Sequence, residues 1–377
     1  MGLALFIATT SFCSPLAPAQ SPTELQRKFA TALVDWKQSA KDAVIALEKF
    51  RYCDANEADT YRQNWIQAIE KGHNCFRSMV ETGIQRIEVE SPPDAEVLAF
   101  LALVLESRYD GGDYEGAYDV GRAMLAVAPD AAGLLVRQTF SAFATNRFEE
   151  CQAHLQQLIQ LTGGYPPELG SIASSIDALV TAWKHEIELL AAESKADDLP
   201  RVELQIQQYG TTDRIVLELF ENEAPNAVAN FISLVEQGFY DGRSFFRVAT
   251  HFDAMSGCPS DDGTGNPGYF IRSEASAPGA RQHFRGTLAM VNMDPSGRAG
   301  SQFYLMFSPN PQLSGRATVF GRVAEGMDVL DRLIRTHFVD NENQKFEQIP
   351  EITPATIETA RVLRKRNHDY VPEKMTE

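Results

Sequence analysis

The spacing of apolar residues changes near residue 200, and this change limits the folds open to the chain more than any other feature. Up to that point apolar residues recur every three to four positions, as in amphipathic helices. From residue 202 they alternate with polar residues, and after a turn at Gly210 the stretch 215–220 forms a second apolar run. That pattern predicts a β-hairpin. The chain of 377 residues is therefore expected to be multidomain, with a helical region followed by a mainly-β domain.

Residues 20–193 are predicted to form an all-α region. Ser21, Pro22 and Glu24 fit a capping residue, a first-turn proline and the acid of a capping box, so a helix is expected to start there. The apolar residues at helical spacing are Leu25, Phe29, Leu33, Trp36, Val44 and Leu47 in a first run, Trp65, Ile66, Ile69, Phe76, Met79 and Val80 in a second, and Ile172, Ile176, Leu179, Trp183 and Ile187 in a third. The polar stretch 194–200, which ends in a proline, is predicted to be a linker.

A weak internal repeat lies within this helical region. The motif at residues 113–117 is echoed at residues 147–151, so that Tyr114 and Phe148 are 34 residues apart. Over about residues 96–163 this period resembles tetratricopeptide helix pairs, which stack to form concave surfaces for peptides or partner proteins. A protein partner on the helical region is therefore one expectation. The alternative is that these helices only pack on the second domain or self-associate.

Residues 1–19 have the features of a signal peptide. A short apolar run at residues 3–12 precedes Ala17-Pro18-Ala19, which fits the small-x-small pattern of a cleavage site. The run is too short to span a bilayer, so no integral membrane segment is expected. We therefore expect export, either to the periplasm or out of the cell. No Lys or Arg precedes the run, and an apolar N-terminus on a protein that is not exported is the alternative.

Four cysteines follow the expected signal peptide. Cys53 and Cys75 lie in one helical region, and in an exported protein they are candidates for a disulfide. The alternative is that they are free thiols that pack as small apolar residues, which we expect for Cys151 and Cys258.

The charge and the histidines exclude several classes of function. A formal net charge of −17 argues against nucleic-acid binding, because phosphate contacts need clustered Lys and Arg. The seven histidines show no pair at metal-ligand spacing, so no metal and no cofactor is expected. The acidic surface favours solubility and attracts basic or unfolded chains.

Residues 201–366 are predicted to form a mainly-β domain, followed by a tail at 367–377. After the first hairpin, Pro225 opens a helix that contains Val228, Phe231 and Leu234. Short strands separated by Gly-rich turns come next, and they favour a closed barrel capped by helices, because closure removes exposed sheet edges.

Six blocks in this domain resemble the cyclophilin-type peptidyl-prolyl cis-trans isomerases, in the family's order. The second, FYDGRSFFRV, resembles the strand that carries the family's catalytic arginine, and the third, GTGNPGY, resembles a loop common in bacterial members. The blocks are residues 224–231, 239–248, 263–269, 286–292, 300–304 and 319–323. The resemblance implies a cyclophilin-like barrel that isomerises Xaa-Pro bonds in proline-containing polypeptides without a cofactor.

The chemistry that the resemblance implies needs few groups. Rotation about a peptide bond costs about 18–20 kcal/mol, and no covalent bond is broken. The catalyst must stabilise a twisted amide whose nitrogen has become basic, which a fixed cation and an apolar slot for the proline ring achieve. Arg247 matches the family's catalytic guanidinium. The alternative for Arg247 is an ordinary charge at the end of a strand.

The resemblance also places the substrate-binding residues. It assigns Phe252, Tyr304 and Leu313 to the proline pocket, with Tyr304 in place of a more usual Phe, whereas ordinary barrel core is the alternative. Asn292, with its neighbours Val291 and Met293, corresponds to a segment that holds the substrate backbone, and Gln302 to a group that supports the arginine. The sequence departs from the family at Asp253 and Met255, where Met and Gln are usual. The sequence leaves open whether the carboxylate at 253 pairs with Arg247; such a pair would hold the arginine or compete with substrate.

These inferences favour a two-part exported protein: a helical docking region and a cyclophilin-like isomerase that acts as a folding helper. The main alternative is a binding module or chaperone scaffold that keeps the proline slot but has lost useful catalysis at positions 253 and 255. A third hypothesis makes the helical part an assembly element of a larger envelope complex.

Overall fold

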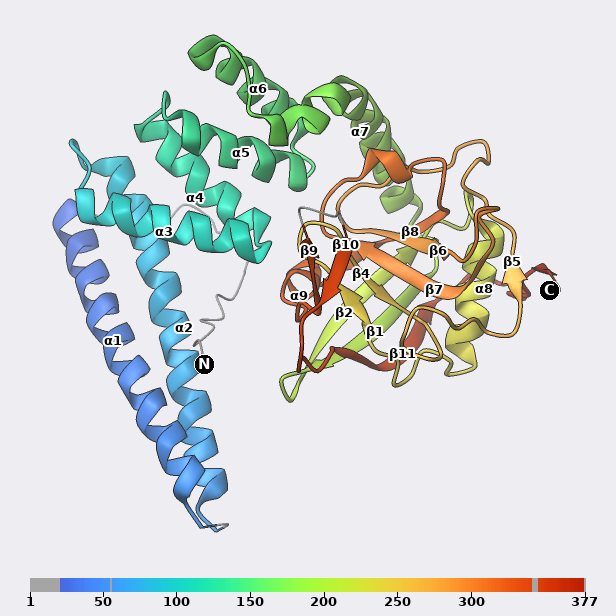
Figure 1. The fold of residues 1–377 in the computed structure, drawn as a ribbon, viewed down its shortest axis with the longest axis horizontal. Helices are drawn as coiled ribbons and strands as arrows, with labels where there is room; N and C mark the ends of the chain where they lie inside the picture. Colours follow the sequence, from blue (N-terminus) through green and yellow to red (C-terminus); the bar gives the residue numbers. More distant parts are fainter. Residues whose placement is uncertain (1–20, 55, 341–344, 376–377) are drawn as a thin grey trace. The chain divides into compact units, whose positions relative to one another are not determined.

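The computed structural model describes residues 21–54, 56–340 and 345–375 (Figure 1). It divides into two compact units, one ending at Gln138 and the other beginning at Thr139. The expected signal peptide lies outside the described residues. Within the described part of the chain, no helix combines the length and the apolar character needed to cross a bilayer.

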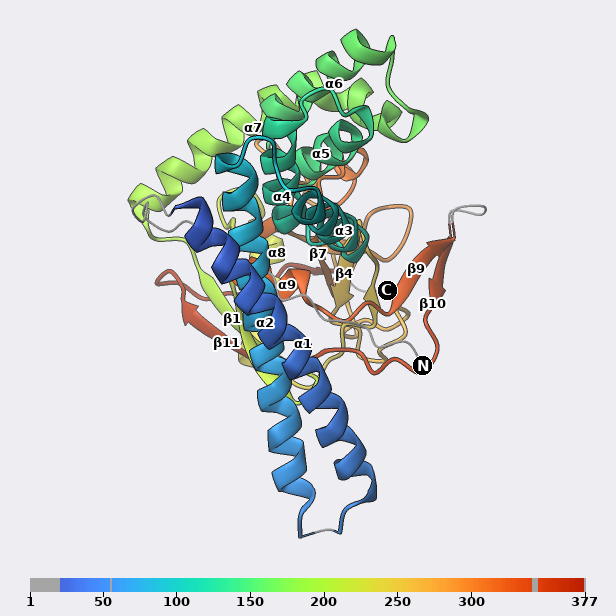
Figure 2. The same ribbon diagram turned by 90° about the vertical axis from the view of Figure 1, so that its left-hand side faces the viewer.

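The first unit is helical, as the periodicity predicts. Ser21 caps the first helix, because its hydroxyl accepts a hydrogen bond from the backbone N–H of Glu24. Helices α1 and α2 lie side by side along most of their length (Figures 1 and 2), and apolar residues of α2, α3 and α4 form a buried cluster. The helices of this unit are α1 (Pro22–Tyr52), α2 (Ala58–Val89), α3 (Ala95–Gly111), α4 (Tyr114–Val127) and the first half of α5 (Ala132–Ala144).

The two motifs of the internal repeat each open a helix. Helix α4 begins at Tyr114, and α6 (Phe148–Thr162) begins at Phe148, and both aromatic rings are buried. Asp113 caps α4 by accepting a hydrogen bond from the N–H of Gly116 at 2.9 Å. The structure thus confirms helices at the expected period, while the likeness to tetratricopeptide repeats stays a prediction.

The four cysteines in the described residues are free thiols. Cys53 and Cys75 are half-buried and are not bridged, whereas Cys151 and Cys258 are buried. All four are therefore unbridged, and the prediction of buried, apolar packing holds for Cys151 and Cys258.

The second unit contains a curled antiparallel sheet with the strand order β11-β1-β2-β8-β6-β7-β4-β3. Its two edges meet, because Ser244, just before β3, forms an antiparallel bridge with Thr356 at the start of β11. The prediction of a barrel-like β domain is thus confirmed. The strands are β1 (Arg201–Gln208), β2 (Thr211–Leu219), β3 (Arg247–Val248), β4 (Asp253–Ser256), β5 (Phe270–Ile271), β6 (Thr287–Asn292), β7 (Ala299–Met306), β8 (Val319–Glu325), β9 (His337–Asp340), β10 (Lys345–Gln348), β11 (Thr356–Arg364) and β12 (Lys374–Met375).

Two helices complete the core of the barrel. Phe231 of α8 (Pro225–Glu236) is fully buried among aromatic side chains, and Leu330 of α9 (Met327–Asp331) is buried in the same cluster. The close approach of β8 to β2 requires a glycine at 321, since a Cβ there would lie 2.6 Å from the carbonyl oxygen of Glu218. The sequence block at 319–323 therefore reflects packing between strands.

The chain after residue 366, expected as a tail, folds back on the barrel. Tyr370 is buried, and its hydroxyl donates a hydrogen bond to Glu221 at 3.0 Å. Strand β12 then pairs with β5.

Helix α7 (Gly170–Ala196) belongs to the same compact unit as the barrel. Its Trp183 ring lies 4.8 Å from the ring of Phe284, and its Leu190 packs against an apolar cluster on the sheet. The helix runs into the stretch expected as a linker and ends at Ala196. The division between the compact units therefore lies well before residues 194–200.

A buried arginine attaches α7 to the barrel. Arg281 is almost completely buried and donates hydrogen bonds to three carboxylates: Glu186 at 2.8 Å, Glu223 at 3.2 Å, and Glu193. Its guanidinium carbon lies 4.1 Å from the centre of the Phe220 ring. Burial raises the pKa of Glu193 to about 7, because one cation does not compensate three desolvated carboxylates.

Candidate active site

Three neighbouring strands bring the predicted site residues into one row. In the registers of β3 with β4 and of β4 with β7, Arg247 lies opposite Met255, and Met255 lies opposite Tyr304. Residues paired across antiparallel strands point to the same face of a sheet. The catalytic candidate and two predicted pocket residues therefore share one face.

Arg247 is held by the acid that departs from the family pattern. Its Nη2 donates to both carboxylate oxygens of Asp253, at 2.7 and 2.8 Å. The Asp253 side chain is buried, and burial raises the pKa of its carboxyl despite the opposing effect of Arg247. The side chain of Arg247 stays 24% exposed, which leaves part of the guanidinium open to a substrate. The pair that the sequence left open therefore forms, and Asp253 restrains the arginine, a task that the resemblance assigns to a Gln at position 255.

An apolar cluster stands beside the arginine. Met255 and Tyr304 are buried in it, and Val291 and Leu313 pack against it half-buried. Four of the predicted substrate-binding residues are thus brought together. Their half-buried members give the cluster an accessible surface of the kind that a proline ring needs.

The hydroxyl of Tyr304, a member of this cluster, contacts the imidazole of His283. It lies 2.8 Å from Nε2 of His283, and the two rings are stacked with their centres 5.9 Å apart. Burial lowers the pKa of His283 to about 4, so the imidazole is neutral at neutral pH. The Tyr in place of Phe therefore adds a satisfied polar contact and no charge.

The two predicted polar residues lie in different surroundings. Gln302 is buried, and its Nε2 donates to the carbonyl oxygens of Gly263 and Gly265, at 2.9 and 2.7 Å. It thereby holds the loop of the third family block. Asn292 is exposed at the end of β6, and its Nδ2 donates to the carbonyl oxygen of Arg316 at 2.8 Å. The half-buried Met293 follows, and its N–H donates to the carbonyl oxygen of Arg298.

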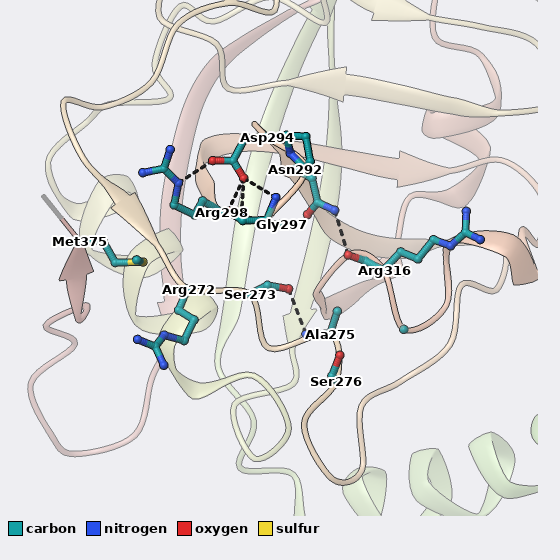
Figure 3. Close-up of a pocket in the computed structure, with 13 residues that line it drawn as sticks. Arg272, Ser273, Ala275, Ser276, Asn292, Asp294, Gly297, Arg298, Arg316 and Met375 are labelled. Atoms are coloured by element: carbon teal, nitrogen blue, oxygen red, sulfur yellow. Dashed lines mark hydrogen bonds and ion pairs between the residues drawn. The ribbon is translucent and has the colours of Figure 1, made fainter. Parts of the chain in front are cut away.

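A pocket of about 670 Å³ adjoins Asn292 (Figure 3). Three arginines line it, of which Arg298 is paired with Asp294 at 2.5 Å. Arg272 and Arg316 are exposed, and neither has a carboxylate partner among the described residues. The pocket is therefore a positively charged recess on a strongly acidic chain.

Phe346 is the site residue that sequence reasoning missed. The stretch 339–353 is mostly polar in sequence, but part of it forms the hairpin of β9 and β10. Phe346 of β10 lies with its ring centre 4.3 Å from the guanidinium carbon of Arg247. Its ring is also edge-to-face with Phe252, at 5.3 Å. The predicted pocket residue Phe252 therefore contacts the hairpin. A single aromatic in a polar stretch gave no usable signal.

Comparison with known proteins agrees with this geometry. A family model described as cyclophilin type peptidyl-prolyl cis-trans isomerase/CLD matches residues 201–357. A peptidyl-prolyl cis-trans isomerase of Helicobacter pylori is 44% identical over 131 residues, which cover 34% of this chain and 78% of the relative. Peptidyl-prolyl cis-trans isomerase B of Bacillus subtilis is 41% identical over 116 residues, which cover 31% of this chain and 80% of the relative.

The chain belongs to the cyclophilin-type peptidyl-prolyl cis-trans isomerases. A solved cyclophilin-type isomerase from Cryptosporidium parvum aligns with 45% of this chain and 99% of its own, at 23% identity and a TM-score of 0.36. The family match begins at Arg201, so the helices before it are outside the matched cyclophilin region.

Proposed function

We propose that the cyclophilin domain catalyses cis-trans isomerisation of Xaa-Pro bonds in polypeptides and that the protein acts as a folding helper. The observation that carries this proposal is the row of Arg247, Met255 and Tyr304 across three strands. It places a fixed cation beside an apolar surface, which is what a twisting prolyl bond requires.

Each part of the site has a defined task. The apolar cluster around Tyr304 and Leu313 takes the proline ring and keeps it still while the rest of the peptide rotates. Arg247 donates a hydrogen bond to the imide nitrogen as that nitrogen becomes pyramidal and basic. Because this interaction is stronger in the twisted state than in either planar isomer, it lowers the barrier. Asp253 keeps the guanidinium in one orientation, so little reorganisation is needed during the reaction.

The test of the proposal is also the test of the binding-module alternative. We expect the wild-type chain to accelerate exchange of a short Ala-Pro peptide, measured by NMR exchange spectroscopy. The matched variant is Met255→Gln, which restores the family residue directly opposite Arg247. We expect it to change kcat/KM by less than about tenfold, since Asp253 already orients the arginine. A wild-type chain that binds the peptide without acceleration, beside a Met255→Gln variant that accelerates exchange, would establish the binding module instead.

The substrates and the site of action are a further part of the proposal. The apolar run and the Ala17-Pro18-Ala19 pattern support export, and the helical region with its repeat of 34 residues supports a docking role for partner chains. Intact-mass measurement of the protein from its native host is expected to show a start at Gln20. A mature protein that retains residues 1–19 would contradict export.

A further inference from the structure

Phe346 lies where the catalytic arginine and the predicted proline pocket meet. Its ring covers one face of the Arg247 guanidinium at 4.3 Å and meets the ring of Phe252 at 5.3 Å, with an angle of 85° between the planes. Asp253 occupies another side of the same guanidinium. A peptide that reaches Arg247 must therefore pass beside Phe346.

The position of Phe346 is set by the strand that carries Arg247. Thr336, just before β9, accepts a hydrogen bond through Oγ1 from the N–H of Val248 at 2.8 Å, and its own N–H donates to the carbonyl oxygen of Val248 at 3.0 Å. The carbonyl oxygen of Thr336 in turn accepts from the N–H of Ile349, just after β10, at 2.8 Å. The base of the hairpin is thus tied to β3, the strand that carries Arg247.

Core packing does not explain this aromatic ring. Phe346 is 37% exposed and lies outside the two clusters of buried residues that the structure describes in the barrel, and the next residues of β10, Glu347 and Gln348, are exposed polar side chains. The ring is partly open to solvent and touches both the Arg247 guanidinium and Phe252, so a peptide bound at these two residues can also contact the ring.

We propose that Phe346 determines specificity for the residue next to the proline, favouring an apolar and above all an aromatic side chain. The inference rests on the proposed isomerase function. With a proline held in the pocket beside Phe252, a neighbouring residue lies 3.8 Å further along the chain between Cα atoms. Its side chain then falls within reach of the open part of the Phe346 ring. An aromatic side chain packs there edge-to-face or offset, whereas a small side chain leaves the Phe346 ring exposed to water.

The test uses peptides that differ only in the residue flanking the proline, which is Ala, Leu or Phe, placed before the proline in one set and after it in another. We expect the full-length wild type to prefer Phe over Ala in one set by about three- to tenfold in kcat/KM, the scale of one aromatic pair. The preference should appear mainly in KM, because the contact is the same in the ground and transition states. In Phe346→Ala the preference should fall below about twofold. The control is Leu363→Ala, which removes a half-exposed apolar residue from β11 and should leave the preference unchanged.

Two outcomes would overturn the inference. One is a Phe346→Ala variant that changes kcat/KM for all peptides by the same factor, which would make the ring a simple cover of Arg247. The other is a wild type that shows no preference in either set. If the wild type binds these peptides without isomerising them, the isomerase proposal fails separately. The Phe-to-Ala ratio of Kd values, from chemical-shift titration of wild type and Phe346→Ala, then decides the role of Phe346.

Discussion

Replacing Arg247 with alanine is expected to lower kcat/KM for Xaa-Pro exchange by about a hundredfold, the scale of losing one donor that acts on the transition state. The variant keeps the apolar cluster of Met255 and Tyr304, so peptide binding should survive while acceleration is lost. NMR exchange spectroscopy on an Ala-Pro peptide measures both quantities in one sample. A kcat/KM within about threefold of wild type would show that the barrier is lowered by another group.

Removal of Arg247 also leaves Asp253 buried without its partner. Burial already raises the pKa of this carboxyl, so in the variant it is expected to take up a proton. Circular dichroism melting must therefore accompany the kinetics. Arg247→Lys is a second variant that keeps the charge but lacks the planar fork, and it should recover only a small part of the activity. The control is Arg214→Ala, which removes a half-exposed arginine paired with Glu203 on the first hairpin and should leave exchange unchanged.

Replacing Arg281 with alanine is expected to destabilise the barrel unit by about 3–5 kcal/mol, the cost of deleting one partner from a buried ionic cluster. The variant leaves Glu186, Glu193 and Glu223 facing one another without their shared cation. It also removes the ring contact with Phe220. Urea unfolding followed by Trp183 fluorescence measures the loss, because this tryptophan packs against Phe284 of the same unit.

The stability lost in Arg281→Ala should increase as the pH rises. The folded-state pKa of Glu193, about 7, lies above the ordinary value of 4.5, so protonation stabilises the folded form at low pH and this contribution disappears as the pH rises through 7. Without Arg281 the carboxylates repel more strongly, and the defect should be larger at pH 8 than at pH 5. The control is Arg322→Ala, because Glu218 keeps Arg201 as a partner and the expected cost is at most about 1 kcal/mol. Equal losses in the two variants, or a defect that does not change with pH, would contradict the role assigned to Arg281.

The local pattern of residues was enough to predict that the first part of the chain is helical and the second part mainly β. The helix starts at Ser21 and Tyr114 are set by caps, and the start at Phe148 by apolar spacing, all within a few residues. The barrel was predicted for a similar reason, because the alternation at residues 202–206 and the Gly-rich turns between short strands are local features of the sequence. Arg247 could be placed from its block alone.

The wider surroundings of the site could not be predicted in this way. Whether Arg247 pairs with Asp253 could not be decided from the sequence, and the pairing of β3 with β4 brings the two side chains together. Gln302 was expected to support the arginine, whereas in the structure it holds the loop at Gly263 through a contact 39 residues away in sequence. Such contacts depend on which strand edges meet, and no window of neighbouring residues contains that information.

The sequence by itself determined that a helical region precedes a barrel-like β domain and where the candidate catalytic arginine lies, because periodicity, caps and motif blocks act over short distances along the chain. Only the tertiary structure decided that α7 packs with the barrel through Arg281 and that Phe346 covers Arg247. Both arrangements join residues about ninety or more positions apart, and their ion pairs and aromatic contacts form only between groups that become neighbours when the barrel has closed.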